Sequence, residues 1–199
     1  MPDQSGLSVQ LSPVTSAFKV LRVVNPVAPV EFPCPPADKD VPMCSRANSL
    51  ADLAQRYGPA GAGTEGALLG LCGYTPQSLA ALSDGTTART SCTFQVPESG
   101  DIVGVLGHMH TLGSTFRLTL DPGTPKQKIL LDIPHWSFNW QMNYGLVTPL
   151  HVTAGEPVRM DCSWDRRLDP TRAPKYIVFS EGTEDEMCFG TYSLIPDNQ

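Results

Sequence analysis

The chain lacks several features that would place it in a common class of protein. It contains no run of roughly 18 apolar residues, so we expect no membrane-spanning helix. Its formal net charge is −6, and an acidic surface argues against a groove that binds nucleic-acid phosphates. The opening residues, MPDQSGLSVQ, have neither the basic nor the apolar region of a signal peptide. If the protein is exported, we expect its signal sequence to lie outside this chain.

The six cysteines contain no CxxC pair, which disfavours a zinc ribbon or a thioredoxin-like motif. They are Cys34, Cys44, Cys72, Cys92, Cys162 and Cys188. An even number of widely spaced cysteines fits three disulfides and an extracytoplasmic protein, whether secreted, periplasmic or at the cell surface. The alternative is a cytosolic protein with six buried free thiols.

Most of the chain alternates apolar and polar residues with the period of a β-strand. In VRMDCSW, for example, Val158, Met160, Cys162 and Trp164 share one face. Strands are also predicted at residues 8–11, 18–24, 90–96, 116–120, 128–133 and 176–179. DPGTP and TAGEP, which begin at Asp121 and Thr153, have turn chemistry. Short, regular strands with such turns predict an all-β fold, an antiparallel β-sandwich resembling a jelly roll.

Helical signals are confined to residues 46–82, within a loop and helix excursion over residues 31–91. SLADLAQRYG predicts a helix that stops at Gly58, with Leu50, Leu53, Ala54 and Tyr57 on one face. A second helix is expected in TPQSLAAL, with Thr75 as its cap and Pro76 at its first position. The stretch GPAGAGTEG between them is expected to be a mobile loop. We predict one domain over residues 1–199.

The stretch GHMHTLG contains two of the only four histidines in the chain. It follows DIVGVL, which reads as a strand. Side chains two residues apart on a strand point to the same face, so His108 and His110 should project together while Met109 faces away. Two adjacent imidazoles suit a metal ion, although paired histidines also occur on surfaces by chance.

A second motif, EGTEDEMCFGTY, follows at residues 181–192. HMH followed much later by EMC resembles the copper type II, ascorbate-dependent monooxygenases, the family of the peptidylglycine α-hydroxylating and dopamine β-monooxygenases. The resemblance covers roughly residues 100–192, including a strand that ends in cysteine, GEPVRMDC. More loosely, SGLSVQL resembles the start of the family's second domain.

The resemblance implies that His108, His110 and Met187 bind one copper ion and form the catalytic site, where O₂ and a small organic substrate react. It also implies a Cys162–Cys188 bridge, after which pairing of neighbours gives Cys34–Cys44 and Cys72–Cys92. In the family a preceding domain carries a second copper, bound by three histidines, that donates electrons. No histidine precedes His108, so we expect that domain to be absent from this chain. Ascorbate, another external reductant or a partner domain would then supply electrons.

Some positions depart from the family's peptide-amidating members. Leu106 stands where they have a substrate-binding arginine, and Phe189 and Thr191 stand where they have asparagine and tyrosine. A peptidylglycine substrate is therefore not expected. His135 and His151 are expected to be hydrogen-bonded or exposed rather than ligands.

Two further groups are open to more than one interpretation. The aromatic cluster of Trp136, Phe138 and Trp140 could line a substrate pocket, but core packing is the simpler interpretation. The acidic run, residues 184–186, could bind cations, but a solvated loop that orients the methionine's strand is simpler.

The sequence therefore predicts a mononuclear copper domain that activates O₂ and hydroxylates a substrate. The alternatives are a copper carriage protein without turnover, and a sandwich whose HMH motif and Met187 never meet a metal. Stoichiometric copper binding would exclude the last of these, and product-linked oxygen consumption would separate the first two.

Overall fold

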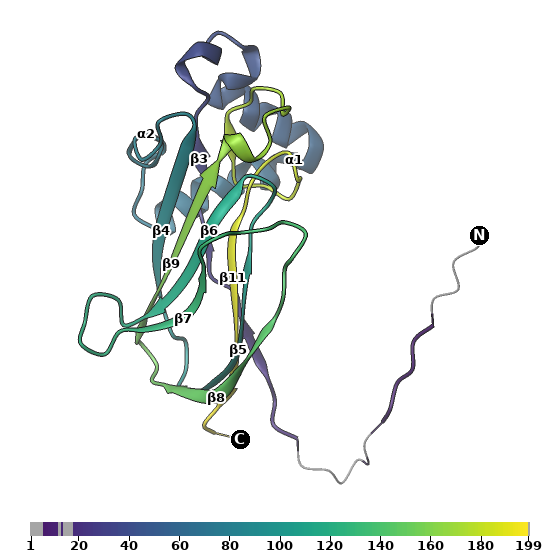
Figure 1. The fold of residues 1–199 in the computed structure, drawn as a ribbon, viewed down its shortest axis with the longest axis vertical. Coiled ribbons are helices and arrows are strands. Elements are labelled where there is room, and N and C mark those ends of the chain that lie inside the picture. The colour runs from purple at the N-terminus through teal and green to yellow at the C-terminus, as the bar shows by residue number, and fades with distance from the viewer. Residues whose placement is uncertain (1–5, 12, 14–17, 199) are drawn as a thin grey trace.

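The computed structural model describes residues 6–11, 13 and 18–198. Two antiparallel sheets form the body of the molecule (Figure 1). The first has the strand order β1-β11-β5-β8, with β2 also pairing with β11, and the second has the order β4-β9-β6-β7. Strands β3 and β10 form a separate pair. In chain order, the strands are β1 (Arg22–Val24), β2 (Val27–Ala28), β3 (Glu31–Phe32), β4 (Thr87–Gln95), β5 (Gly100–His108), β6 (Gly113–Leu120), β7 (Lys128–Ile133), β8 (Tyr144–Val152), β9 (Pro157–Asp165), β10 (Ile177–Val178) and β11 (Cys188–Pro196).

The two sheets enclose one hydrophobic core. On β9, residues alternate between buried and half-buried, and the buried set is the one that the period of two predicted: Val158, Met160, Cys162 and Trp164. Glycines let the sheets approach closely. A Cβ added at Gly107 would lie 2.5 Å from the Phe116 ring, so β5 can pack against β6 only without a side chain there. The predicted all-β antiparallel sandwich is confirmed.

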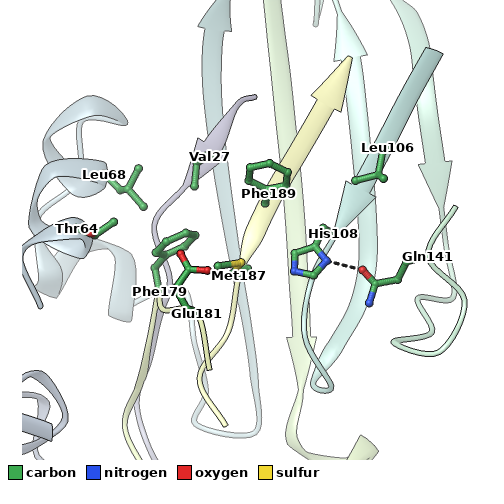
Figure 2. Close-up of a pocket in the computed structure, with 10 residues that line it drawn as sticks. All are labelled: Val27, Thr64, Leu68, Leu106, His108, Gln141, Phe179, Glu181, Met187 and Phe189. Atoms are coloured by element: carbon green, nitrogen blue, oxygen red, sulfur yellow. Dashed lines mark hydrogen bonds between the residues drawn. The ribbon is translucent and has the colours of Figure 1, made fainter. Parts of the chain in front are cut away.

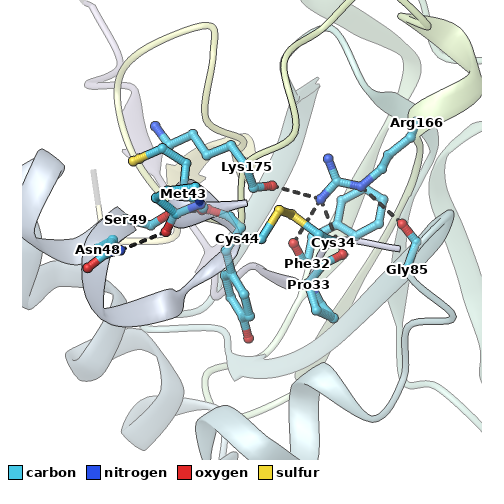
Figure 3. The surroundings of a disulfide bond; sticks show 12 residues. Phe32, Pro33, Cys34, Met43, Cys44, Asn48, Ser49, Gly85, Arg166 and Lys175 are labelled. Atoms are coloured by element: carbon cyan, nitrogen blue, oxygen red, sulfur yellow. Dashed lines mark hydrogen bonds between the residues drawn. A yellow bond between two sulfur atoms is a disulfide. The ribbon is translucent and has the colours of Figure 1, made fainter. Parts of the chain in front are cut away.

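Three disulfides join distant segments: Cys34–Cys44, Cys72–Cys92 and Cys162–Cys188. These are the three pairs expected from the sequence. Cys162–Cys188 links β9 to β11 and therefore crosses between the two sheets. Beside Cys34–Cys44, Arg166 donates hydrogen bonds to the carbonyls of Phe32, Pro33, Lys175 and Gly85 (Figure 3). This arginine fastens the segment that carries the first disulfide to the end of β9.

The helical segment lies at one end of the sandwich (Figure 1). Helix α1 spans Arg46–Leu71, with a break at Gly58, where φ is +77°. The predicted stop at Gly58 is therefore a kink, and the predicted mobile loop at 58–66 is wrong. Pro59 is suited to the first position of a helix, and Glu65 and Leu69 are buried, so the chain continues as a second helical stretch. Helix α2 (Pro76–Ala80) has the predicted Thr75 cap. Short 3₁₀ helices lie at Pro36–Asp38, Pro42–Cys44 and Arg166–Leu168.

Two strand predictions need correction, and one long strand was missed. Residues 8–11 are exposed and form no strand, because no neighbouring strand offers them a partner in the part of the chain described. Within 18–24, only Arg22–Val24 pairs, with β11. Strand β8 was not predicted; it is an edge strand with mostly exposed residues and a proline, and therefore lacks a clear apolar face.

Candidate metal centre

The two histidines of HMH lie side by side at the end of β5. Their ring centroids are 5.3 Å apart and the rings are nearly perpendicular. Met109 between them is fully buried in the core, as the strand alternation predicted. His110 is also buried, with 3% of its surface exposed, whereas His108 lines a pocket. The backbone therefore presents both imidazoles on the face opposite Met109.

The hydrogen bonds fix the same tautomer in both rings. Nδ1 of His110 lies 3.2 Å from the carbonyl oxygen of Asp185, which can only accept, so Nδ1 carries the proton. His108 Nδ1 contacts the side-chain oxygen of Gln141, whose amide nitrogen donates to Phe138. With the proton on Nδ1, the lone pair of each neutral ring lies on Nε2. An outer hydrogen bond on Nδ1 is the usual support of a metal-binding histidine, so this pair fits a copper ion.

Burial also favours the neutral, metal-binding form of His110. Burial lowers the pKa of His110, as does neighbouring His108, and this outweighs the opposite effect of the Asp185 carbonyl. A neutral imidazole has the lone pair that a metal requires, while an imidazolium does not. The neutral His110 ring can therefore bind a metal ion without first losing a proton.

Met187 lies in the loop immediately before β11, the strand that pairs with the histidines' strand β5. Phe189 on β11 pairs with His108 on β5, and Met187 precedes it by two residues. Cys188 between them points to the opposite side and is anchored by its disulfide to Cys162. Figure 2 shows His108 between Met187 and Gln141, with Phe189 above. The structure therefore places His108 beside His110 and in one pocket with Met187, although Met187 is far from the histidines in the sequence; His110 itself does not line that pocket.

Met187 and His108 open onto a pocket of about 560 Å³. Its wall is mainly apolar and comes from the sheet that contains β2, β5 and β11, from α1 and from the segment between β10 and β11: Val27, Leu68, Leu106, Phe179, Met187 and Phe189. The polar lining consists of Thr64, Gln141, Glu181 and His108. Among the described residues that line the pocket, Glu181 is the one carboxylate and none is lysine or arginine.

The acidic run is not a solvated loop. Glu184 is exposed, but Asp185 and Glu186 are completely buried. The Glu186 carboxylate accepts from the backbone N–H groups of His110 (2.9 Å) and Leu112 (2.7 Å) and from the Trp164 indole (3.0 Å). Burial raises the pKa of Glu186 to about 7, although these N–H groups favour its charged form. The expected role of orienting the methionine's strand holds, but the contacts are internal: this carboxylate ties that strand to the HMH turn.

The other aromatic and histidine residues lie outside the candidate ligand set. His135 is exposed, and His151 contacts Asp101 at 3.1 Å on the surface. Of the aromatic cluster, Trp136 is buried and donates to the His110 carbonyl, while Trp140 is 68% exposed and belongs to no core. Phe138 stacks edge-on near His110, with ring centroids 6.4 Å apart. Within the cluster, Trp136 therefore belongs to the core, Phe138 lies at the candidate site and Trp140 lies on the surface.

Sequence patterns gave no sign of several residues at the site. Gln141 reaches it from the segment between β7 and β8, which no motif marks, whereas Glu181 and Glu186 lie in the loop before β11, within EGTEDEMCFGTY, a motif that pointed to Met187 and not to their contacts. Within the described part of the chain, no group of three or more His, Cys, Asp or Glu side chains could hold a metal ion. A metal site built on the two imidazoles would therefore need a ligand of another type, and the thioether of Met187 is the candidate.

These features define the class: an antiparallel β-sandwich with two imidazoles and a thioether in one region, ligand types that suit copper. The chain belongs to the copper type II ascorbate-dependent monooxygenase family, because the C-terminal domain of that family matches residues 68–192. The match begins in the second half of α1, so it does not extend to SGLSVQL. A search of curated proteins finds no match. No helix in the described residues is long and apolar enough to cross a membrane.

Proposed function

We propose that this chain is the oxygen-activating, substrate-hydroxylating copper domain of a monooxygenase. One copper ion would be held by Nε2 of His108, Nε2 of His110 and the sulfur of Met187. The observation that carries the proposal is the pair of imidazoles with both Nδ1 atoms engaged, one of which, His108, shares an apolar pocket with Met187. Such a set suits copper in both oxidation states, since imidazole binds each and a thioether favours Cu(I).

Copper bound here would supply the one-electron chemistry that activates O₂ for insertion of an oxygen atom into a C–H bond. The protein's own contribution is positioning. Gln141 and the Asp185 carbonyl hold the two rings, and the disulfide at Cys188 holds the strand that carries Met187. The apolar pocket wall would exclude water and hold the substrate carbon near the reacting centre.

The pocket favours a small, largely apolar organic substrate. Leu106 and Phe189 supply apolar surface at positions where the peptide-amidating relatives have polar groups. A substrate carboxylate would find no cation among the lining residues and would face the Glu181 carboxylate, which disfavours its binding. We therefore do not assign a peptidylglycine substrate.

Hydroxylation requires two electrons for each O₂, and one copper ion supplies one. The chain has four histidines, of which two belong to the proposed site, so the remaining two are too few for a second copper bound by three histidines. The remaining electron would come from ascorbate, from another reductant or from a partner copper domain. Three disulfides and the family assignment support an extracytoplasmic location, where such disulfides persist. We treat the sandwich and its 31–91 excursion as a single domain.

The test is oxygen uptake by the copper-loaded chain with ascorbate, measured together with ¹⁸O incorporation from labelled O₂. The substrates would be neutral aromatic compounds, amines and carboxylates of similar size. We expect slow ¹⁸O-labelled product that disappears in His108→Ala. Tight copper binding without labelled product from any substrate, even with a chemical reductant, would contradict the monooxygenase assignment and favour copper carriage.

A further inference from the structure

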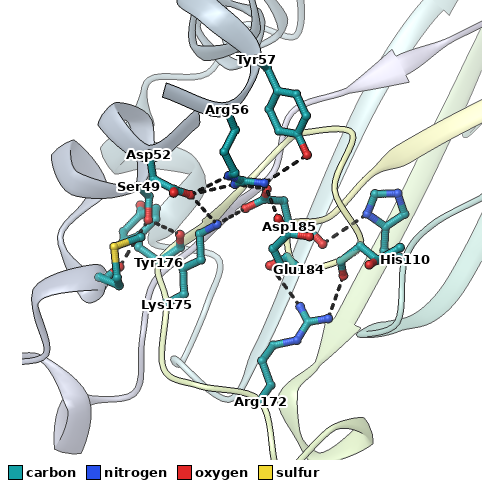
Figure 4. Close-up of polar contacts among 12 residues, drawn as sticks. Ser49, Asp52, Arg56, Tyr57, His110, Arg172, Lys175, Tyr176, Glu184 and Asp185 are labelled. Atoms are coloured by element: carbon teal, nitrogen blue, oxygen red, sulfur yellow. Dashed lines mark hydrogen bonds and ion pairs between the residues drawn. The ribbon is translucent and has the colours of Figure 1, made fainter. Parts of the chain in front are cut away.

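The loop that carries Met187 is fastened to helix α1 by buried ion pairs. The Asp185 carboxylate, which is completely buried, contacts Arg56 Nη2 at 2.7 Å and Lys175 Nζ at 2.6 Å. Both cations also reach Asp52, at 2.8 and 3.2 Å (Figure 4). Asp52 and Arg56 lie one turn apart on the first half of α1. The helix therefore supplies both a cation for Asp185 and an anion that holds the two cations together.

The same residue, Asp185, supports the metal site through its backbone. Its carbonyl oxygen accepts from His110 Nδ1, so one residue joins the ion pairs on one side to the imidazole on the other. Figure 4 shows this order, from α1 through Asp185 to His110. From the opposite side, Arg172 donates to the Thr183 carbonyl at 2.9 Å and also contacts the Thr111 hydroxyl. The loop is thus held between two arginines, and Arg56 is the one that comes from outside the family match.

We infer that Arg56 is a positioning residue for the copper site: by holding the Asp185 carboxylate, it sets the carbonyl that orients His110. This inference rests on the proposed function. A buried carboxylate that loses one of its two cations is costly to keep in place, so without Arg56 the Asp185 side chain would move towards water. Its own carbonyl would move with it, and His110 would lose the hydrogen bond that fixes its tautomer.

The first test needs no copper. The apoprotein, labelled with ¹⁵N at histidine, would be compared as wild type, Arg56→Gln and Arg117→Gln. The last is a matched control, because Arg117 also pairs with an aspartate, Asp132, but on the outside of the other sheet. We expect the ¹⁵N shifts of His110 to report one tautomer, with the proton on Nδ1, in the wild type and the control. In Arg56→Gln they should report a mixture.

The second test measures Cu(I) affinity by competition with a chelator of known affinity, for folded protein only. Outer hydrogen-bonding partners of metal ligands typically change affinity by 10-fold to 100-fold, and Arg56 acts one step further out. We therefore expect Arg56→Gln to weaken Cu(I) by roughly 3-fold to 10-fold, with Arg56→Lys restoring part of the loss. Should Arg56→Gln not fold, Asp52→Asn removes the shared anion from α1 and should change the same two measurements in the same direction.

The outcomes separate the inference from the function. An unchanged His110 tautomer and unchanged Cu(I) affinity in both Arg56→Gln and Asp52→Asn would overturn the positioning role, even if the wild type binds copper. If the wild type binds no copper but Arg56→Gln still alters the His110 tautomer, the positioning of His110 stands and the proposed function fails.

Discussion

At the scale of single residues, His110 is the most constrained group at the site. Its backbone N–H donates to the Glu186 carboxylate, and its backbone carbonyl accepts from the Trp136 indole. Its ring Nδ1 forms a hydrogen bond with the Asp185 carbonyl oxygen. All three partners are buried. With its backbone held at two points and its ring at a third, His110 has little freedom to lose when a metal binds, and this favours affinity.

Glu186→Gln tests this restraint. The carboxylate accepts three N–H groups with its two oxygens, and an amide nitrogen in place of either oxygen would face a donor. A buried donor left without a partner costs about 1 to 3 kcal/mol, so we expect the free energy of unfolding to fall by that amount. Copper affinity should also fall, by roughly 10-fold or more. Urea denaturation and copper titration would measure both; unchanged stability would show that Glu186 does not hold the turn.

Met187→Ile tests the sulfur. Isoleucine keeps the apolar bulk in the pocket but removes the thioether, which prefers Cu(I). We expect Cu(I) affinity to fall far more than Cu(II) affinity in competition titrations, while His135→Ala and His151→Ala leave copper stoichiometry at the wild-type value. Equal losses for the two oxidation states would remove Met187 from the ligand set, and loss of the metal in His151→Ala would mean that the set is wrong.

The sequence predicted these residues to different degrees. The period of two in the strand was enough to place His108 and His110 on one face, because strand geometry is local. Met187 was found through the resemblance alone, since a lone methionine is usually core filler. Glu186 meets His110 across 76 residues and Gln141 meets His108 across 33. Contacts at such distances depend on how the sheets pack, so no local pattern could reveal them.

At the scale of elements, strand β11 fixes the position of Met187, the third proposed ligand. It lies between β1 and β5 in its sheet, and its first residue, Cys188, is bonded to β9 in the other sheet. The loop that carries Met187 therefore leads directly into a strand fixed on three sides. Helix α1 plays the comparable role for the loop before Met187. The sequence predicted helices before and after residues 58–66 but a loop within them, because this stretch is rich in glycine. The burial of Glu65, which favours a helix here, could not be predicted from the sequence.

Replacing both Cys162 and Cys188 with alanine tests the element that carries Met187. Their sequence separation is 26, and a bridge that closes a loop of this size stabilises by roughly 3 kcal/mol in the chain-entropy model. We expect the unfolding free energy to drop by about that amount and Cu(I) affinity to fall as the strand end loosens. As a control, replacing both Cys34 and Cys44 should cost stability without the same loss of affinity. Equal effects on affinity would show that β11 does not depend on its bridge.

At the scale of the whole molecule, the pocket lies between the sheet that contains β5 and β11, helix α1 and the loop before β11, and two of the proposed ligands, His108 and Met187, line it. The all-β sandwich could be predicted because alternation and turns are local signals. The pocket could not be predicted, because its wall combines Val27, Thr64, Gln141 and Glu181 from four separate segments.

The supply of electrons limits what the chain can do alone. One copper ion carries one of the two electrons that each O₂ requires, so ascorbate must reach the site within each cycle. We predict slow, poorly coupled hydroxylation with ascorbate and a marked increase when an electron-donating copper domain is added. Simultaneous records of oxygen uptake and product would show the coupling. Fast, fully coupled turnover by the chain and ascorbate alone would show that a single copper site suffices.

The most direct test of the central claim is X-ray absorption spectroscopy of the protein loaded with one equivalent of Cu(I). The account predicts two imidazole nitrogens and one sulfur around copper, with the sulfur contribution lost in Met187→Ile and one imidazole lost in His110→Ala. A spectrum without sulfur in the wild type, or with sulfur that persists in Met187→Ile, would contradict the assignment of His108, His110 and Met187 as the copper ligands.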